Sequence, residues 1–128
     1  MDNEMIKLVK NDRFAAYVGI KLVEVEPGRA VTQMEITDDH LNGVGIVQGG
    51  AIFTLADYAF AAASNSKGIT TLGINANISY FKSPRGKIIT AEATEVSAGK
   101  KLCGYNVDVF DENKELIARF SATGYAKG

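Results

Sequence analysis

The segment from Gly49 to Asn65 constrains the fold more than any other part of this sequence. It is rich in alanine, leucine and phenylalanine, it contains no proline, and Ser66 and Gly68 follow it as stop signals. Its apolar residues point in every direction around a helix, which is the pattern of a buried helix rather than of a surface helix. We therefore expect one long helix that other parts of the chain cover.

A single carboxylate interrupts this helix. Asp57 stands among apolar residues, and at 100° per residue it shares one stripe with Thr54, Tyr58 and Ala61. An isolated buried charge is costly, so this carboxylate must be paired, hydrogen-bonded or protonated. Two interpretations stay open from the residues alone. Asp57 is a functional acid on a solvent-exposed face of the helix, or it is a core carboxylate that other groups of the protein hydrogen-bond or pair.

Segments with strand patterns surround the predicted helix. Apolar alternation on both sides of Pro27-Gly28 predicts a first hairpin, and four more strands are expected after the helix. The expected strands cover residues 20–25, 30–36, 69–81, 87–96, 101–110 and 116–125. Because short turns separate the later strands, we expect consecutive hairpins and an antiparallel sheet that packs against the helix. Apolar residues at helical spacing predict a helical segment over residues 1–17, with Asp12 as a cap.

Length and composition favour one domain over residues 1–128, with enough hydrophobic residues (46%) for an ordinary core. The formal net charge of −1 gives no basic surface for nucleic acid. No uncharged run is long enough for a membrane span and no signal-peptide pattern opens the chain, so we expect a cytoplasmic protein without membrane partners. With one cysteine and one histidine we expect no metal site, a core role for Cys103 and a loop role for His40.

Residues 42–50 form a glycine-rich approach to the helix and leave unpaired amides at its start. Together with the positive end of the helix dipole, the amides of Gly49 and Gly50 can hold a carbonyl oxygen that becomes negative during attack. Asp57 lies about two turns beyond Gly50, on the order of 10 Å along the axis, which is too far to serve the same terminus. Antiparallel pairing of two such helices across a dimer would bring the carboxylate of one near the amides of the other.

A dinucleotide-binding loop is an alternative interpretation of these glycines. In Gly43-x-Gly45-x-x-x-Gly49, however, the last interval is one residue too long. No βαβ unit is expected after it, and no acidic residue ends the next strand near Tyr80. The pattern therefore disfavours a nucleotide cofactor.

The segment from His40 to Asp57 resembles the signature of the PaaI-like acyl-CoA thioesterases, which belong to the hotdog-fold superfamily. Members of that family show Asn, five residues, His-Gly-Gly and then a helix with Leu-Ala-Asp. Here Asn42, residues 48–50 and residues 55–57 occupy those places, and the similarity extends over about residues 17–125. The resemblance implies an α+β hotdog fold, in which a curved antiparallel sheet of about six strands wraps a long central helix.

The resemblance also implies hydrolysis of an aryl- or medium-chain acyl-CoA to free acid and CoA, without a cofactor. Asp57 aligns with the family's catalytic carboxylate, acting as nucleophile or as general base on water. The amide of Gly49 or Gly50 aligns with the oxyanion donor, and Asn42 aligns with a residue that positions the water or the thioester. In the family these groups come from opposite protomers, which implies a homodimer, or a homotetramer built as a dimer of dimers.

Two departures from the family pattern affect the site. Gln48 replaces the usual histidine; it can hydrogen-bond the thioester but does not titrate near neutral pH. Some related thioesterases have a hydroxyl residue on the strand after the helix, where this chain has Gly73, with Thr71 two residues earlier. A hydratase of the same fold is disfavoured because His40, the only histidine, lies well short of the helix.

Further residues are expected to bind the substrate. We expect Thr54 on the helix to contact it and basic side chains at two turns to contact the CoA phosphates, although solvated surface charge is the alternative. The basic candidates are Lys82, Arg85, Lys100 and Lys101. Aromatic residues that line an acyl pocket or merely belong to the core are Phe53, Phe60, Tyr80 and Phe81. Two non-enzymatic alternatives stay open, an acyl-CoA-binding module of the same fold and a structural oligomerisation domain.

Overall fold

The computed structural model describes residues 3–127, and its elements follow the expected order. The helices are α1 (Glu4–Lys10), α2 (Arg13–Val18), the short 3-10 helix η1 (Asp38–His40) and α3 (Gly49–Ser64). The strands are β1 (Ile20–Glu26), β2 (Arg29–Glu35), β3 (Thr71–Tyr80), β4 (Ile88–Ala98), β5 (Leu102–Phe110) and β6 (Leu116–Ala126). The α+β class is confirmed; Met1 and Asp2 of the expected N-terminal helical segment lie outside the described residues.

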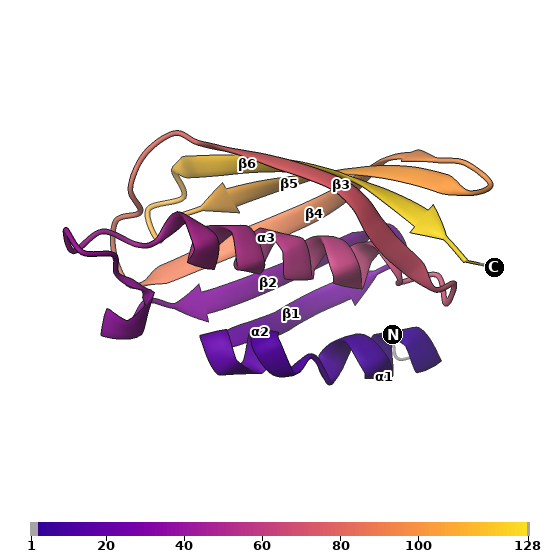
Figure 1. Cartoon of the computed structure of the whole chain (residues 1–128), viewed down its shortest axis with the longest axis horizontal. Helices are drawn as coiled ribbons and strands as arrows, with labels where there is room; N and C mark the ends of the chain where they lie inside the picture. Colours follow the sequence, from indigo (N-terminus) through magenta and orange to yellow (C-terminus); the bar gives the residue numbers. More distant parts are fainter. Residues whose placement is uncertain (1–2, 128) are drawn as a thin grey trace.

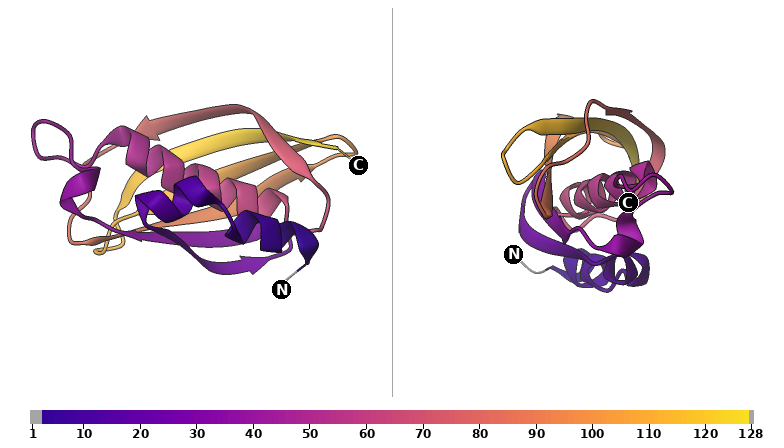
Figure 2. Two further views of the ribbon diagram at one scale, coloured as in Figure 1. Left: turned by 60° about the horizontal axis from the view of Figure 1, so that its bottom comes forward. Right: turned by 90° about the vertical axis from the view of Figure 1, so that its left-hand side faces the viewer.

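One six-stranded sheet, in the order β1-β2-β4-β5-β6-β3, curves around α3 (Figure 1). All of its strand pairs are antiparallel. The end-on view in Figure 2 shows α3 inside the curve, with α1 and α2 beside it on the side of β1. The hotdog architecture expected from the resemblance is therefore present, and every strand contributes contacts to the central helix.

The expectation of consecutive hairpins is wrong for β3 and β4. β3 pairs with β6 at the edge of the sheet, while β4 lies in the middle between β2 and β5. The amides of Phe81 and Lys82 both donate to the carbonyl of Ile117, so the chain follows β6 past the end of β3 before it crosses to β4. Because β2 and β5 occupy both sides of β4, β3 does not pair with β4 and instead pairs with β6.

The central helix is held in the sheet by hydrogen bonds as well as by apolar packing. The Thr32 hydroxyl donates to the carbonyl of Leu55 (2.9 Å), and the Tyr105 hydroxyl donates to that of Ala63 (3.2 Å). Phe60 packs edge to face on Tyr105, with ring centroids 5.7 Å apart. These contacts fix the rotation of α3 about its own axis. Within residues 3–127, no helix is long and apolar enough to cross a membrane.

Glycine at two facing positions makes room for Phe60. A Cβ at Gly73 would lie 3.1 Å from the Phe60 ring, and one at Gly124 would lie 3.3 Å from it. These glycines are register partners on β3 and β6. The position where some relatives have a hydroxyl residue is thus filled by a core aromatic in this chain. Thr71, two residues earlier, is buried, and its hydroxyl donates to the carbonyl of Ile69.

Candidate active site

One face of α3 stays uncovered in the protomer, although the helix is apolar on nearly every side. Its exposed and half-exposed positions, at helical spacing, are Gly50, Phe53, Thr54, Asp57 and Ala61. Tyr58 does not belong to this face: it is buried, and its hydroxyl donates to the carbonyl of Val9 (2.9 Å). The expected polar stripe is therefore wrong at Tyr58, because the N-terminal helices cover that side of α3.

Asp57 lies in the middle of the uncovered face. Its side chain is exposed in the protomer, yet nearby protein atoms remove part of its hydration, and this raises the pKa of the carboxyl above its ordinary value. The carboxylate of Asp12, the N-cap of α2, raises that pKa further by like-charge repulsion. Within the described residues, no salt bridge or hydrogen bond satisfies the Asp57 carboxylate. The interpretation of Asp57 as a satisfied core acid is therefore wrong for the protomer.

Asn42 orders the loop that leads into α3. Its side-chain Oδ1 accepts from the backbone amides of Val44 (3.0 Å) and Ile46 (3.1 Å). Its backbone N–H donates to the carbonyl of Ile46 (2.7 Å). Gly45 adopts a positive φ of 80° at the tip, which a residue with a side chain rarely adopts. Within the described residues, the side chain of Asn42 is bonded only through Oδ1, so its Nδ2 group can donate to a ligand.

The first turn of α3 presents two amides with different partners. Gln48 is the N-cap, and its Oε1 accepts from the Gly50 amide at 3.3 Å. Among residues 3–127, no atom accepts a hydrogen bond from the Gly49 amide. The Tyr80 hydroxyl donates to the Gly49 carbonyl (2.8 Å), which holds this end of the helix against β3. Of the two amides that sequence analysis singled out, Gly49 is thus the one ready to bind an oxyanion.

The carboxylate and the free amide do not meet within one protomer. Asp57 lies eight positions after Gly49 along a regular helix, a rise of about 12 Å. Both groups nevertheless lie along the same uncovered length of α3. The Thr54 hydroxyl lies between them and donates to the Gly50 carbonyl at 2.8 Å.

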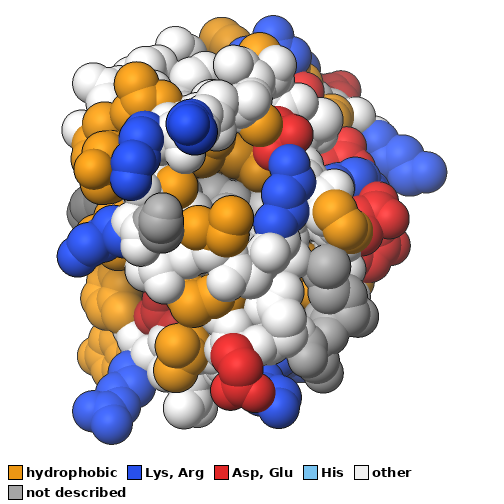
Figure 3. All heavy atoms as spheres, turned by 90° about the vertical axis from the view of Figure 1, so that its right-hand side faces the viewer, with side chains coloured by type: hydrophobic (Ala, Val, Ile, Leu, Met, Phe, Trp, Pro, Cys, Tyr) orange, Lys and Arg blue, Asp and Glu red, His pale blue; other side chains and the backbone are white. Residues whose placement is uncertain are grey.

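The basic residues predicted to contact CoA do not form one cluster in the protomer. Lys82 and Arg85 follow β3 near the start of α3, whereas Lys100 and Lys101 form the β4–β5 turn at the opposite end of the sheet. Figure 3 shows that opposite end, where basic side chains are dispersed among apolar ones. The first turn follows the end of β3 and the second precedes the start of β5. The length of the strands therefore separates the two turns. Lys82 is also paired with Glu115 (2.6 Å), and Lys101 lies over the Tyr125 ring.

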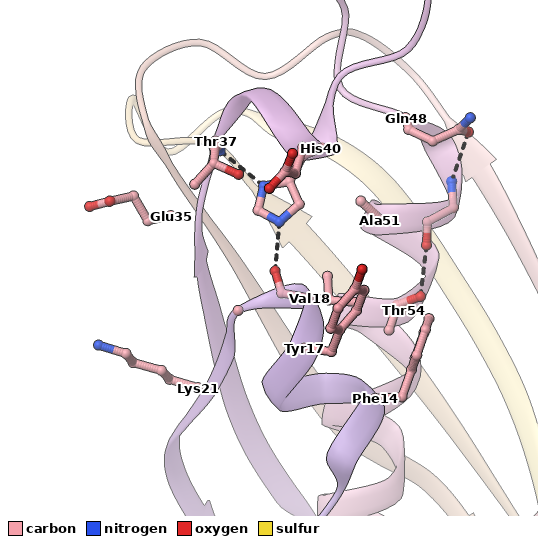
Figure 4. Close-up of a pocket in the computed structure, with 13 residues that line it drawn as sticks. Phe14, Tyr17, Val18, Lys21, Glu35, Thr37, His40, Gln48, Ala51 and Thr54 are labelled. Carbon is pink, nitrogen blue, oxygen red and sulfur yellow. Dashed lines mark hydrogen bonds between the residues drawn. The ribbon is translucent and has the colours of Figure 1, made fainter.

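Two N-terminal aromatics that sequence analysis missed border a groove next to the start of α3 (Figure 4). The groove has a volume of about 800 Å³ and lies between α2 and the first turns of α3; we call it the α2 groove. Its lining includes Phe14, Tyr17 and Val18 from α2, and Gln48, Gly50, Ala51 and Thr54 from the other side. The only signal in the sequence was two aromatics on a short predicted helix, which a surface helix can also carry.

His40 has the structural role that was expected for it. Its Nδ1 accepts from the Thr37 amide (3.0 Å), and its Nε2 lies 2.6 Å from the carbonyl of Val18, to which it donates. Gly19, with φ at 93°, ends α2 and leaves the Val18 carbonyl free for this bond. The buried ring thereby fastens α2 to η1.

Replacing His40 with alanine is expected to destabilise the fold by about 1–3 kcal/mol, because the Val18 carbonyl and the Thr37 amide would both lose a partner. Urea unfolding of the wild type and of His40→Ala measures this difference. His40→Asn, which can restore one of the two bonds, should fall between them. Equal midpoints and slopes for all three proteins would contradict the assigned role.

The other aromatic and ionisable candidates belong mainly to the core. Phe53 packs edge to face on Phe120 (5.2 Å between centroids) and is half-exposed on the uncovered face of α3, whereas Phe60 is buried. Neither residue lines the α2 groove. Cys103 is half-buried against the core, and burial raises the pKa of its thiol, as expected of an inert cysteine. In the part of the chain that the structure describes, no group of His, Cys, Asp and Glu residues is placed to hold a metal ion.

Comparison with known proteins gives a consistent result. Residues 44–118 match the family described as the thioesterase superfamily. The chain is 38% identical to a protein of Archaeoglobus fulgidus named "Putative esterase", covering 92% of this chain and 77% of that protein. It is 30% identical to the acyl-coenzyme A thioesterase PaaI of Escherichia coli, covering 94% and 87%. The solved structure of the Escherichia coli PaaI protein superposes with a TM-score of 0.90 at 29% identity, covering 95% of this chain and 89% of that one.

Proposed function

Because the chain belongs to the thioesterase superfamily as a PaaI-like hotdog thioesterase, we propose that it hydrolyses acyl-CoA thioesters at a site shared between two copies of the chain. Asp57 of one protomer and the Gly49 amide of the other supply the chemistry. The products are the free acid and CoA, and the preferred acyl groups are aryl or of medium length. No cofactor takes part.

One observation carries this proposal: within residues 3–127, the Gly49 amide at the start of α3 and the Asp57 carboxylate about 12 Å further along the helix both have no hydrogen-bond partner. When two such faces pack antiparallel, each carboxylate lies opposite the other helix's N-terminus. β3 supports the same pairing, because it is an edge strand whose free side offers unpaired backbone groups. Leu72 and Ile74 on β3 are also more than half exposed, which a second copy can cover.

The Gly49 amide stabilises the charge that develops during attack. When the carbonyl carbon of the thioester becomes tetrahedral, its oxygen becomes negative and accepts from this N–H at the positive end of α3. Because Gln48 Oε1 accepts from the Gly50 amide, the two Nε2 hydrogens of Gln48 remain to donate to the same oxygen. A neutral amide thus does the hydrogen bonding for which the family usually has histidine.

The Asp57 carboxylate of the opposite protomer drives the attack. As a general base it takes a proton from water while the water oxygen bonds to the carbonyl carbon; the C–S bond then breaks, and the CoA thiolate takes up the proton. As a nucleophile it displaces the CoA thiolate itself and forms an anhydride, which water hydrolyses. Both routes need the ionised carboxylate. In this proposal Asn42, in the loop before α3, and Thr54, on the helix, position the water or the substrate.

Mixing two inactive variants tests the shared site. Asp57→Asn removes the carboxylate, and Gly49→Pro removes the amide hydrogen at the other end of the helix. A mixed dimer has one site with both groups intact and one site with neither. With random subunit exchange, half of the dimers are mixed, so we expect about a quarter of wild-type thiol release from acyl-CoA.

Subunit exchange must be shown by native mass spectrometry on the same samples. A mixture of Asp57→Asn with Asp57→Ala serves as the control, since no dimer in it contains a carboxylate at this position. If the first mixture exchanges fully and stays inactive, the two groups do not act across a dimer. If the wild type binds CoA but releases no thiol from any acyl-CoA, the chain is the binding module of the same fold.

A further inference from the structure

The α2 groove has an apolar side that nothing within the described residues covers. Phe14 is 61% exposed and Tyr17 is 88% exposed, although large aromatic side chains favour burial. Figure 4 shows both rings beside Thr54 on the uncovered face of α3. Val18 and Ala51 add aliphatic surface to the same groove. An apolar ligand in the groove would therefore remove a large hydrophobic area from water.

The α2 groove opens directly at the candidate active site. Its lining on the α3 side is Gln48, Gly50, Ala51 and Thr54, and Gln48 and Gly50 are the chain neighbours of Gly49, whose free amide begins the helix. A thioester whose carbonyl oxygen is held at this amide has two substituents, the CoA sulfur and the acyl group. The groove can accept either of them, and its surface chemistry decides between the two. The pantetheine arm of CoA carries two amides that need hydrogen-bond partners, whereas aromatic and aliphatic walls suit a hydrocarbon.

Although α2 has only six residues, it is fixed at both ends. The Asp12 carboxylate accepts from the Ala15 amide (2.9 Å) at its start, and His40 donates to the carbonyl of Val18 at its end. The Tyr58 hydroxyl also holds the end of the preceding helix α1, by donating to the carbonyl of Val9. The backbone that carries the two aromatic side chains is therefore in place before a ligand binds, which lowers the entropic cost of binding.

We propose that the α2 groove binds the acyl group of the thioester, and that Phe14 and Tyr17 determine which acyl groups are hydrolysed well. This inference rests on the proposed function and names the acyl-binding surface of that site. Both residues lie outside residues 44–118, the segment that matches the thioesterase superfamily, so the family match does not assign them.

The far end of the α2 groove limits the length of the acyl group. Figure 4 shows Lys21 and Glu35 on the side of the groove away from Gln48 and Thr54, and both residues are exposed. An acyl chain that reached this end would place methylene groups against ionised, hydrated side chains, with no hydrophobic gain. The groove thus favours octanoyl or phenylacetyl groups over palmitoyl.

The test compares acyl selectivity in wild type, Phe14→Ala, Tyr17→Ala and the double variant. Thiol release is measured with acetyl-, octanoyl-, phenylacetyl- and palmitoyl-CoA. Leu8→Ala is the matched control, because Leu8 is 64% exposed on α1 and does not line the groove. We expect the double variant to lower the ratio of kcat/KM for octanoyl-CoA to that for acetyl-CoA by about tenfold or more, and Leu8→Ala to leave this ratio unchanged.

Two additional measurements separate the possible outcomes. Dissociation constants for CoA and for a non-hydrolysable octanoyl-CoA thioether show whether a loss lies in acyl binding, and sedimentation velocity shows the oligomeric state. An equal loss for all four substrates, with weaker binding of CoA itself, would assign the groove to pantetheine and overturn the proposal. Dissociation of the oligomer in Tyr17→Ala would assign the groove to a second copy of the chain, and this would overturn the proposal too. Unchanged acyl selectivity in the double variant would also overturn the proposal.

Failure of the proposed function would look different. In that case the wild type releases no thiol from any of the four substrates. The groove proposal is then judged by binding alone: it stands if the double variant selectively loses the octanoyl thioether, and it falls if the double variant binds both ligands as the wild type does.

Discussion

Replacing Asp57 with asparagine is expected to lower kcat/KM for acyl-CoA hydrolysis by a factor on the order of 10² to 10⁴, because the amide can neither accept the proton of water nor attack the thioester. Thiol release from octanoyl- and phenylacetyl-CoA measures the loss. The uncovered face of α3 carries no other carboxylate among the residues that the structure describes. The neighbouring carboxylate of Asp12 caps α2 by accepting from the Ala15 amide, so we do not expect it to replace Asp57. Asp57→Ala should lose as much, since it also lacks the carboxylate.

The same substitution is expected to stabilise the folded protein near neutral pH. Partial burial and Asp12 raise the pKa of Asp57 in the folded state, so the ionised side chain opposes folding at pH values above that pKa. The neutral amide removes this cost. The advantage of Asp57→Asn should therefore shrink as the pH falls through the raised pKa towards the ordinary value of 3.8, where the wild-type carboxyl becomes protonated. Melting temperatures of both proteins as a function of pH measure it.

The activity of the wild type should also follow the titration of the Asp57 carboxyl, but protonation, which removes the cost to stability, should lower the activity. The reaction needs the carboxylate, so kcat/KM should fall with decreasing pH, with a limb that lies above the ordinary pKa of an aspartate. Undiminished turnover in a folded, dimeric Asp57→Asn would remove this residue from the mechanism. A lower melting temperature of the variant at neutral pH would show instead that the carboxylate is stabilised in the assembled protein.

Replacing Gly49 with proline is expected to lower kcat/KM by about 10² to 10³, the typical loss when one oxyanion donor is removed. Proline has no N–H, and it is well tolerated at the first position of a helix. The backbone suits it, because Gly49 is not among the positive-φ glycines and Gln48 before it is extended, with ψ at 131°. The helix should therefore form as before without the free amide.

Gly49→Ala is the matched control for this experiment. A Cβ at this position lies 3.1 Å from the ring and hydroxyl of Tyr80, so both variants push on the same exposed side chain, but only proline loses the N–H. We expect Gly49→Ala to retain at least about a tenth of wild-type activity. Circular dichroism checks that both variants keep their helix content. Similar losses in the two variants would trace the effect to Tyr80 and not to the amide.

Much of the fold could be read from local sequence patterns. The all-round apolar segment that begins at Gly49 predicts α3 to within one residue of its end, and alternation with turn residues predicts the positions of all six strands. These signals are local, because helix and strand periodicity depend on neighbours along the chain. The pairing of β3 was not predictable in this way: turn residues between β3 and β4 indicate a change of direction, but not which strand lies alongside.

The candidate site likewise has features that follow from local sequence and features that depend on the tertiary structure. The sequence alone determined that Asp57 is a carboxylate on an apolar helix and that glycine amides open that helix, because both follow from residue type and helical spacing. Only the tertiary structure decided which groups are free. The Gly50 amide donates to Gln48, and the Tyr58 hydroxyl donates to the carbonyl of Val9. The turns that carry the basic residues lie at opposite ends of the sheet. Hydrogen-bond partners and groove walls come from segments that are distant in sequence. Phe14 and Tyr17, for example, line the same groove as the first turns of α3, and this arrangement exists only after the chain has folded.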